Sequence, residues 1–519
     1  MAVNNGTTKM SNYRWTIVAM LFMATTINYL DRQVLSLTWN DFIAPEFHWT
    51  DKNYGLITAL FSIFYAISLL FAGRFIDWMG TKKGFLWAIG IWSLGAVIHA
   101  FCGIATSGVA AGEWLVGFHG ASEAIRNFIG PETGIDYLAN VGKVINISVV
   151  LFIFARLVLA IGEAGNFPAA IKTTAEYFPK KDRAYATSIF NAGATVGALA
   201  APIVIPFLAK TWGWEASFIV IGALGFIWMG WWQFGYAKPE SNSRVNAAEL
   251  EYIQQDGDDV KHAKNNSNAK ISFKKCFEYK QTWAFAFGKF MTDGVWWFFL
   301  FWTPAYLSSV YGLKSSDPEA QFALFILYAI TLLSIVGGWL PTFFVEKKGM
   351  EPYAGRMRSM LIFAFFPLLA LFAQPLGSFS YWFPIIIIGI AGAAHQAWSA
   401  NIFSTVGDMF PKAAIATITG IGGLAGGIGS TLINYGSGML FDYSRGTTMQ
   451  AGEEVVMSKE LLETGAEFIR QPMNFFGYNG IEAGYFIIFG ICAVAYLIGW
   501  IVMKNLVPKY SPITDLIEN

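Results

Sequence analysis

Charged side chains are scarce in this sequence. Asp, Glu, Lys and Arg make up only 13% of the 519 residues, whereas hydrophobic residues make up 55% and aromatic residues 17%. A soluble protein carries about 25% charged residues, because polar groups must cover its surface. Apolar side chains that face lipid need no such cover. The composition therefore excludes an ordinary soluble protein and indicates an integral membrane protein.

Two further shortages narrow the function. The three cysteines, Cys102, Cys276 and Cys492, lie far apart without a CxxC or histidine spacing, so the sequence predicts neither a metal site nor a disulfide framework. Neither sign of charge is in excess, since 35 basic residues balance 35 acidic ones, and nothing indicates a nucleic-acid partner. The glycine-rich stretch 420–429 lies in an apolar segment with no Lys-Ser/Thr after it, so it predicts close helix packing and not a phosphate loop. We expect no cofactor.

Long apolar segments recur along the whole chain. A membrane-spanning helix needs about 20 largely apolar residues. The first such segment continues past charged residues without a small-residue cleavage site, so we interpret it as a membrane helix and not as a secretory signal. The sequence predicts an all-α membrane protein with twelve transmembrane helices, at residues 15–37, 54–77, 84–104, 148–173, 185–208, 215–236, 281–310, 319–345, 358–375, 381–404, 414–440 and 483–504.

A polar, lysine-rich stretch divides these helices into two groups of six. Suppose that both termini lie in the cytoplasm. The cytoplasmic segments then hold about three times as many Lys and Arg residues as the external ones, as is usual for membrane proteins. We therefore predict an N-in, C-in topology. The expected units are an N-terminal bundle (1–236) with an external insertion (105–147), a cytoplasmic linker (237–280), a C-terminal bundle (281–504) with a second external insertion (441–482), and a cytoplasmic tail (505–519). The insertions could cap an entrance or have no role.

The two groups of six helices resemble each other in sequence. Residues 73–84 and 338–349 both run from a Gly to a Lys-Lys-Gly after the second helix of their group. Residues 176–180 (EYFPK) and 408–412 (DMFPK) follow the fourth helix of their group. Such repeats predict two parallel bundles that hold a substrate between them near the middle of the membrane.

Several motifs resemble those of a known family. Gly73, Asp77, Gly80 and Lys82 match the loop signature of the major facilitator superfamily, although the second copy lacks the Asp. We interpret these four residues as a latch, in which an Asp at the helix end and basic groups in the loop hold the cytoplasmic side closed in the outward-facing state. Residues 28–32 (NYLDR) and the motifs around Arg156, 162–168 and 290–298 are more narrowly similar to the anion:cation symporters, above all to bacterial hexuronate transporters. This similarity implies proton-coupled uptake of glucuronate or galacturonate across a bacterial inner membrane.

Charges inside the first and fourth predicted helices require a reason, because each costs about 2.5–3.5 kcal/mol on insertion scales. Asp31 and Arg32 are adjacent in the first helix. The rise of 1.5 Å per residue places Arg156 of the fourth helix at a matching depth, so Asp31 and Arg156 could pair. Glu163 follows Arg156 by two helical turns and lies on the same face, which Asn166 extends.

Two interpretations of these charges compete. In the functional one, the planar fork of Arg32 binds a substrate carboxylate, and Asp31 or Glu163 carries the coupled proton. In the other, the charges form a static ion-pair network between the two helices. We favour the functional interpretation for Asp31, Arg32 and Glu163. For Arg156, substrate contact and simple neutralisation of Asp31 both stay open.

Other polar side chains are candidates for contacts to a sugar. In the seventh helix, Lys289 and Asp293 have the spacing of an internal ion pair, which we favour over substrate binding. Trp296 and the adjacent Trp297 could form an aromatic wall for a sugar ring or only pack. The tenth helix carries His395, Gln396, Trp398 and Asn401, which predict polyol contacts, with interhelical hydrogen bonds as the alternative. A lone His is more often structural. Tyr29 and Tyr65 are weaker candidates for sugar contacts.

The sequence thus predicts a symporter that imports a sugar acid together with protons by alternating access, as a monomer in a lipid bilayer. The first alternative is a symporter for an aldonate or another small organic anion. An intramembrane enzyme that uses Asp31 and Glu163 as acid and base is an alternative of a different class, against which the repeated halves argue. A channel is disfavoured by the buried constellation of charges.

Overall fold

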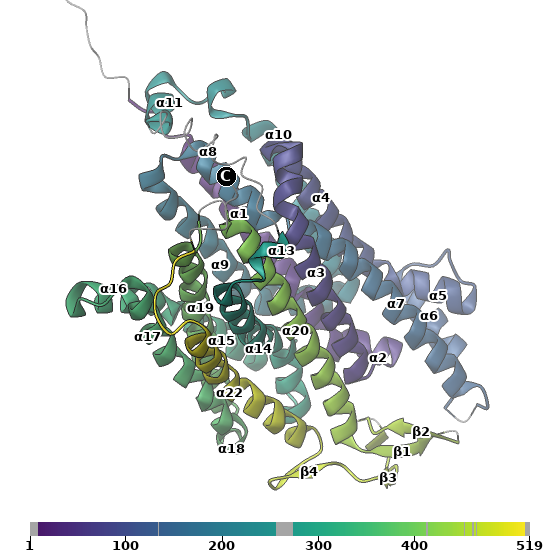
Figure 1. The fold of residues 1–519 in the computed structure, drawn as a ribbon. Helices are drawn as coiled ribbons and strands as arrows, with labels where there is room; N and C mark the ends of the chain where they lie inside the picture. Colours follow the sequence, from purple (N-terminus) through teal and green to yellow (C-terminus); the bar gives the residue numbers. More distant parts are fainter. Residues whose placement is uncertain are drawn as a thin grey trace, which may run out of the picture.

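The computed structural model consists mainly of long helices packed side by side (Figure 1). It describes residues 9–132, 134–255, 273–411, 414–450, 452–458, 461–462 and 464–513. Part of the expected linker (256–272) and the end of the expected tail (514–519) lie outside the described residues. The strands and α11 lie at opposite ends of the molecule (Figure 1).

The first half of the chain forms six long helical segments with short elements between them. Its elements are α1 (Arg14–Thr38), η1 (Trp39–Ile43), α2 (Ala44–Phe47), α3 (Asp51–Met79), α4 (Thr81–Ala100), α5 (Cys102–Ala111), α6 (Phe118–Ile129), α7 (Tyr137–Glu163), α8 (Asn166–Tyr177), α9 (Lys180–Trp212) and α10 (Trp214–Gly235). A short 3₁₀ turn, η2 (Pro239–Ser241), and α11 (Ala247–Gln254) follow. Glu249 of α11 accepts hydrogen bonds from the backbone N–H groups of Tyr13 and Arg14, which ties this part of the linker to the start of α1.

The second half has the same plan with more interruptions. Its elements are α13 (Phe273–Cys276), α14 (Lys280–Tyr311), α15 (Pro318–Ile330), η3 (Thr331–Ile335), α16 (Val336–Lys348), α17 (Pro352–Phe365), η4 (Phe366–Phe372), α18 (Ala373–Gly377), α19 (Trp382–Met409), α20 (Ile415–Arg445) and α22 (Ile481–Leu506). Among the described residues of the segment before α22 there are five short strands: β1 (Thr447–Gln450), β2 (Glu453–Val456), β3 (Phe468–Arg470), β4 (Asn474–Phe475) and β5 (Tyr478–Asn479).

Each of the twelve apolar segments predicted from sequence lies in helical structure. In the described part of the chain, nine helical segments are both long and apolar enough to cross a membrane. The other three predicted segments correspond to α1, α14 and α20, which have 25, 32 and 31 residues. Intramembrane charges in α1 and α14 and frequent glycine in α20 lower their hydropathy, although their lengths suffice for a crossing.

The fourth predicted helix is broken next to its charged residues. α7 ends at Glu163 and α8 begins at Asn166. Pro168 explains the break, because a proline has no N–H to donate and its ring clashes with the carbonyl group four residues earlier, here that of Ala164. The break places Glu163 and Asn166 on either side of a turn in the middle of the bundle.

The repeat predicted from the loop motifs appears as equivalent contacts in the two halves. Thr81 at the start of α4 donates a 2.6 Å hydrogen bond to Glu176 near the end of α8. In the second half, Arg356 near the start of α17 forms a 2.7 Å ion pair with Asp408 near the end of α19. An acidic residue from the EYFPK or DMFPK motif therefore holds the start of the preceding long helix in both halves.

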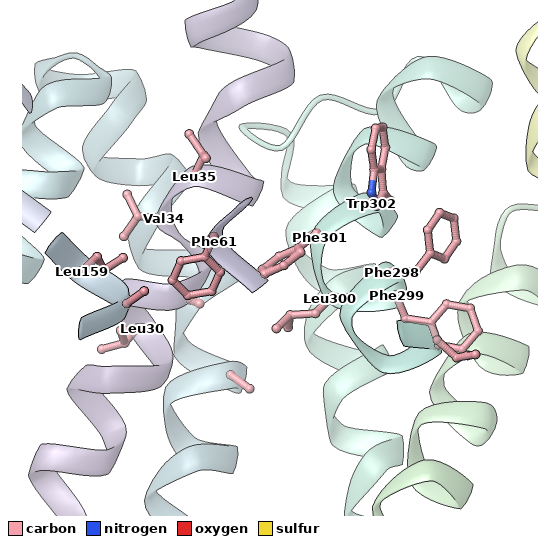
Figure 2. Close-up of a cluster of buried hydrophobic side chains, with 14 of the residues drawn as sticks. Leu30, Val34, Leu35, Phe61, Leu159, Phe298, Phe299, Leu300, Phe301 and Trp302 are labelled. Carbon is pink, nitrogen blue, oxygen red and sulfur yellow. The ribbon is translucent and has the colours of Figure 1, made fainter. Parts of the chain in front are cut away.

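The halves meet mainly where α3 packs on α20, α1 on α14 and α9 on α15. Glycine permits the closest approach, since a Cβ on Gly427 of α20 would lie 2.2 Å from the Cβ of Ala66. This confirms helix packing as the role of the glycine-rich stretch. Phe61 of α3 and Phe301 of α14 point toward one another across the interface (Figure 2), with ring centroids 6.2 Å apart.

The two long insertions are more ordered than the sequence indicated. Residues 105–147 contain part of α5, all of α6 and the first turns of α7, which begins at Tyr137 and not near residue 148. The four-residue spacing of Ala121, Ile125 and Ile129 buries one face of α6. Within 441–482, β2, β1 and β3 form an antiparallel sheet and β4 pairs with β5. A search for long apolar runs misses both, because α6 is short and amphipathic and the strands have two to four residues.

A close contact between α7 and α4 leads to a prediction of stability. A Cβ on Gly162 would lie 2.2 Å from the backbone nitrogen of Trp92, whereas a Cβ on Gly142 of the same helix would meet nothing within 4 Å. Gly162→Ala should therefore push α7 away from α4 and destabilise the protein by about 1–3 kcal/mol. Thermal unfolding in detergent checks this, with Gly142→Ala as the matched control. Equal melting temperatures for the two variants would contradict the close packing.

Candidate functional site

Five polar side chains from α1, α7 and α8 are buried in the middle of the first half. Asp31, Arg32, Arg156, Glu163 and Asn166 are each at most 5% exposed. Asp31 lies within electrostatic reach of Glu163, Arg156 and Arg32, so the four charges form one group. The structure therefore brings together the charged residues that the sequence marked as exceptional.

Arg32 and Glu163 form the central ion pair of this group. The Nη2 and Nε atoms of Arg32 donate to the same oxygen of Glu163, Oε2, at 2.7 and 3.0 Å. Both side chains are buried, and hydrogen bonds to ionised groups are about twice as strong as neutral ones. A carboxylate thus already occupies the fork of Arg32, which shows that this fork accepts a carboxylate at this place.

Three aromatic rings enclose the guanidinium group of Arg32. Its Cζ lies 5.2 Å from the ring centroid of Tyr29, 4.8 Å from that of Tyr65 and 5.0 Å from that of Trp297. Aromatic faces attract cations at such distances. Trp297 belongs to the second half, so the site includes groups from both bundles.

The expected contact between Asp31 and Arg156 is not formed. Both oxygens of Asp31 and the Nε and Nη1 atoms of Arg156 make no hydrogen bond to any described residue. Arg156 instead places its guanidinium 5.0 Å from the ring centroid of Phe61. Neighbouring residues of a helix point about 100° apart, so matching depth alone does not decide which of Asp31 and Arg32 faces α7.

The group retains unused hydrogen-bonding capacity. Besides Asp31 and Arg156, the second oxygen of Glu163 and both side-chain amide atoms of Asn166 and Asn28 have no partner among the described residues. Such buried polar atoms are rare in folded proteins and call for an explanation. The sequence placed Asn28 in the 28–32 motif, but it was not identified as a site residue. Its position three residues before Asp31, on the same helix face, is the signal that could have identified it.

The second half contributes a separate polar cluster. Lys289 and Asp293 of α14 form the predicted internal ion pair at 2.7 Å. The ring of Trp296 stacks on His395 of α19 with centroids 5.4 Å apart, and Nδ1 of His395 lies 2.7 Å from the hydroxyl of Tyr496. These contacts give His395 structural partners, as a lone histidine often has.

The other candidates on α19 differ in their surroundings. Gln396 is only partly buried. Trp398 is fully buried and packs against Tyr496 with centroids 5.5 Å apart. The side-chain amide group of Asn401 donates to the carbonyl oxygens of Gly337 and Ala397, both at 2.8 Å. For Asn401 these contacts favour the interhelical alternative. Trp398 packs against a neighbouring helix, but its indole Nε1 has no hydrogen-bond partner among the described residues. Gln396 keeps its polar group for other partners.

One end of the interface between the halves is held by aromatic and charged side chains. Trp39 stacks on Tyr54 with centroids 4.0 Å apart, and Tyr54 in turn contacts Trp302 of α14 edge to face at 5.0 Å. Further toward the same end, Asp51 at the start of α3 forms a 2.7 Å ion pair with Arg445 at the end of α20. These contacts join the halves at the end where the β-strands lie (Figure 1).

The four residues of the loop signature lie at the opposite end of α3. Asp77 forms a 2.7 Å ion pair with Lys172 of α8, and its side chain is 74% exposed. Gly80 has a φ of 77°, a conformation that favours glycine, and separates α3 from α4. A Cβ on Gly73 would meet nothing within 4 Å, and the carbonyl group of Lys82 accepts a hydrogen bond from Trp232. In this structure Asp77 therefore binds within its own half.

Two helix bundles, one of which holds a buried charged site that is closed by a side chain of the other, are typical of secondary transporters. Residues 21–433 match the model of the Major Facilitator Superfamily. The chain is 27% identical to the hexuronate transporter of Escherichia coli (strain K12) over 438 residues, which cover 84% of this chain and 89% of that protein. It is 25% identical to the galacturonate transporter of Dickeya chrysanthemi over 336 residues, 65% of this chain and 84% of that one.

A solved structure supports the same fold. A bacterial homologue of the human lysosomal transporter Spinster aligns with a TM-score of 0.64 at 19% sequence identity, over 96% of this chain and 99% of that one. The chain belongs to the Major Facilitator Superfamily and is a membrane transporter, not an enzyme.

Proposed function

We propose that the protein is a proton-coupled symporter that imports a sugar acid, specifically a hexuronate such as glucuronate or galacturonate. The observation that carries this proposal is the Arg32–Glu163 pair, in which a buried guanidinium holds a carboxylate inside an aromatic enclosure formed by both halves. The hexuronate and galacturonate transporters among the relatives support the same substrate class. An aldonate or another small organic anion remains the alternative substrate.

The ion pair suggests how substrate and proton are coupled. The carboxylate of Glu163 and the carboxylate of a sugar acid compete for the same fork of Arg32. Protonation of Glu163 removes its negative charge and frees the fork, so a substrate anion can replace it without leaving Arg32 unpaired in a buried site. Substrate and proton would then bind together.

Asp31 and Arg156 would act on the conformational step. Asp31 has no described hydrogen-bond partner while Arg156 and Arg32 are within electrostatic reach, so its ionisation changes the balance of charge between α1 and α7. We propose that Asp31 is the second proton-carrying group. Arg156 and Asn166 would supply additional donors to the substrate anion.

The sugar ring and its hydroxyls would be bound by side chains from both halves. Tyr29 and Tyr65 already surround Arg32. Trp296 would lie against the sugar ring, and Gln396 would exchange hydrogen bonds with its hydroxyls. For Trp398 and Asn401 we propose only a supporting role, since one is fully buried and the other is bonded to backbone carbonyls.

Two alanine substitutions on α19, one at Gln396 and one at Asn401, test the proposed contact to the substrate hydroxyls. Gln396→Ala should weaken binding of the sugar acid by about 1 kcal/mol or more, because a buried hydroxyl loses its partner. The loss should shrink for a deoxy analogue that lacks that hydroxyl. Asn401→Ala should lower thermal stability and leave the preference between the two ligands unchanged. Isothermal titration of both variants checks this, and equal losses for both ligands in Gln396→Ala would assign Gln396 to packing.

Alternating access would use the two ends of the interface in turn. We propose twelve crossings with both termini in the cytoplasm of a bacterium, so that the contact between Asp51 and Arg445 would face outward. Gly73, Asp77, Gly80 and Lys82 would then form the latch that closes the cytoplasmic end in the outward-facing state. The functional unit would be a monomer in the inner membrane.

Uptake by the purified protein tests the proposed function directly. Proteoliposomes with an imposed pH gradient should accumulate labelled glucuronate or galacturonate, and the internal label should be the unchanged sugar acid. Collapse of the gradient with a protonophore should abolish accumulation. Accumulation that needs no pH gradient would overturn the proposed coupling to protons. Transport of aldonates in preference to hexuronates would overturn the proposed substrate.

A further inference from the structure

A hollow of about 430 Å³ lies beside the first half, away from the charged site. It is formed by the start of α1, the end of α10 and the chain that follows α10, with Tyr13, Trp231, Phe234 and Arg244 among its lining residues. α10 ends at Gly235, after which the chain enters the polar linker. The hollow therefore lies at the level where membrane gives way to water.

Arg244 brings a positive charge to this hollow. It is exposed, and no carboxylate of the described residues lies within 4.0 Å of its side chain. Its Nη1 donates to the hydroxyl of Tyr13 at 2.9 Å and to the carbonyl oxygen of Phe234 at 3.0 Å. Nε and Nη2 make no hydrogen bond to any described residue. The bonds of Nη1 therefore fix the position of the guanidinium group, while its Nε–Nη2 edge is free to bind an anion.

The lack of an acidic partner is specific to Arg244, as a comparison with the nearby Arg14 shows. Arg14 lies at the start of α1, next to Tyr13 of the hollow, but it is buried and forms a 3.2 Å ion pair with Glu249. Its charge is therefore balanced within the protein. The charge of Arg244 is balanced by no described acidic group and is available to an external anion.

An apolar surface leads from Arg244 along α10. Ile227, Trp231 and Phe234 are 69%, 42% and 82% exposed, and their spacing of four and three residues places them on one helix face. Because α10 is apolar and long enough to cross a membrane, this face contacts lipid chains. Gly230 lines the hollow beside this face, and a Cβ added to it would meet nothing within 4 Å.

We propose that this hollow binds an anionic phospholipid, with the phosphate on the Nε–Nη2 edge of Arg244 and an acyl chain in the groove beside Gly230. The guanidinium fork matches phosphate geometry, and Tyr13 holds the fork in position. Trp231 is of a residue type that anchors helices at the membrane interface. The charge alone would also suit free inorganic phosphate, but the exposed apolar face of α10 beside the hollow fits a lipid.

Native mass spectrometry of the full-length protein tests this site. The protein is released from micelles that contain equal amounts of phosphatidylglycerol and phosphatidylcholine, and bound lipids are counted. Arg244→Gln removes the charge. Gly230→Leu fills the groove and leaves the charge in place. Arg358→Gln is the control, because Arg358 is also exposed and also lies over an aromatic ring, that of Phe344 at 5.1 Å.

The wild-type protein and Arg358→Gln should retain phosphatidylglycerol in preference to phosphatidylcholine. Arg244→Gln should retain phosphatidylglycerol about tenfold less than the wild type, the effect of one charge-assisted contact of about 1.4 kcal/mol. Gly230→Leu should retain less of either lipid at an unchanged melting temperature. Unchanged retention by Arg244→Gln would overturn the proposal. Displacement of phosphatidylglycerol by millimolar inorganic phosphate would overturn it too, in favour of a free-phosphate site.

Discussion

Replacing Glu163 by Gln should abolish accumulation of sugar acid driven by a pH gradient. The Gln side chain imitates the protonated acid in size and charge, so Arg32 is permanently released from its internal partner. The variant should still exchange labelled for unlabelled glucuronate at equal pH on both sides, at a rate within about tenfold of the wild type, because exchange requires no net release of a proton. Uptake and counterflow in proteoliposomes measure the two activities side by side.

Two further variants complete this experiment, one as a control and one at the second carboxylate of the charged group. Glu215→Gln changes another buried glutamate, at the start of α10 and outside the charged group, and should leave both activities unchanged. Asp31→Asn should also lose accumulation, since Asp31 shares the electrostatic environment of Glu163. If both Glu163→Gln and Asp31→Asn still concentrate substrate against its gradient, neither acid carries the coupled proton and the network is structural.

Replacing Arg32 by Lys should weaken sugar-acid binding at least tenfold, about 1.4 kcal/mol. Lysine keeps the charge but not the planar fork, and both Nε and Nη2 of Arg32 take part in holding a carboxylate. The amine would still lie near the rings of Tyr29, Tyr65 and Trp297, so the loss isolates the hydrogen-bond geometry from the charge. Isothermal titration with glucuronate in detergent measures it.

Arg14 offers a matched control for this substitution. It lies on the same helix, is also buried, and also pairs with a buried glutamate, Glu249. Arg14→Lys should therefore change stability and leave affinity for the sugar acid unchanged. An unchanged affinity in Arg32→Lys, or an equal loss in both variants, would remove Arg32 from the substrate site.

Much of this architecture could be predicted from sequence, because lipid imposes a strong pattern. Long apolar runs mark the helices even where the structure interrupts them, as at Pro168. Charges inside apolar helices are costly enough that Asp31, Arg32, Arg156 and Glu163 are conspicuous without any structure. The internal pair of Lys289 with Asp293 could be predicted too, since both residues lie on one helix at a fixed spacing.

The contacts between these residues could not be predicted in the same way. Helical rise gives the depth of Asp31 and Arg156, but the rotation of each helix decides whether Asp31 or Arg32 faces Glu163. The enclosure of Arg32 by Trp297 depends on how the halves pack, and the ion pair of Asp51 with Arg445 joins residues 394 positions apart. Short amphipathic elements such as α6 give no signal in a search for long apolar runs.

Affinity for glucuronate as a function of pH tests the coupling between Glu163 and Arg32 most directly. If protonated Glu163 is the state that releases Arg32, wild-type affinity should be highest at low pH and should fall by about tenfold per pH unit once Glu163 ionises in the empty carrier. Glu163→Gln should bind glucuronate equally well at every pH at which the affinity of the wild type changes. A wild-type affinity that does not depend on pH, or a Glu163→Gln variant that keeps the wild-type dependence, would contradict the exchange of carboxylates on Arg32.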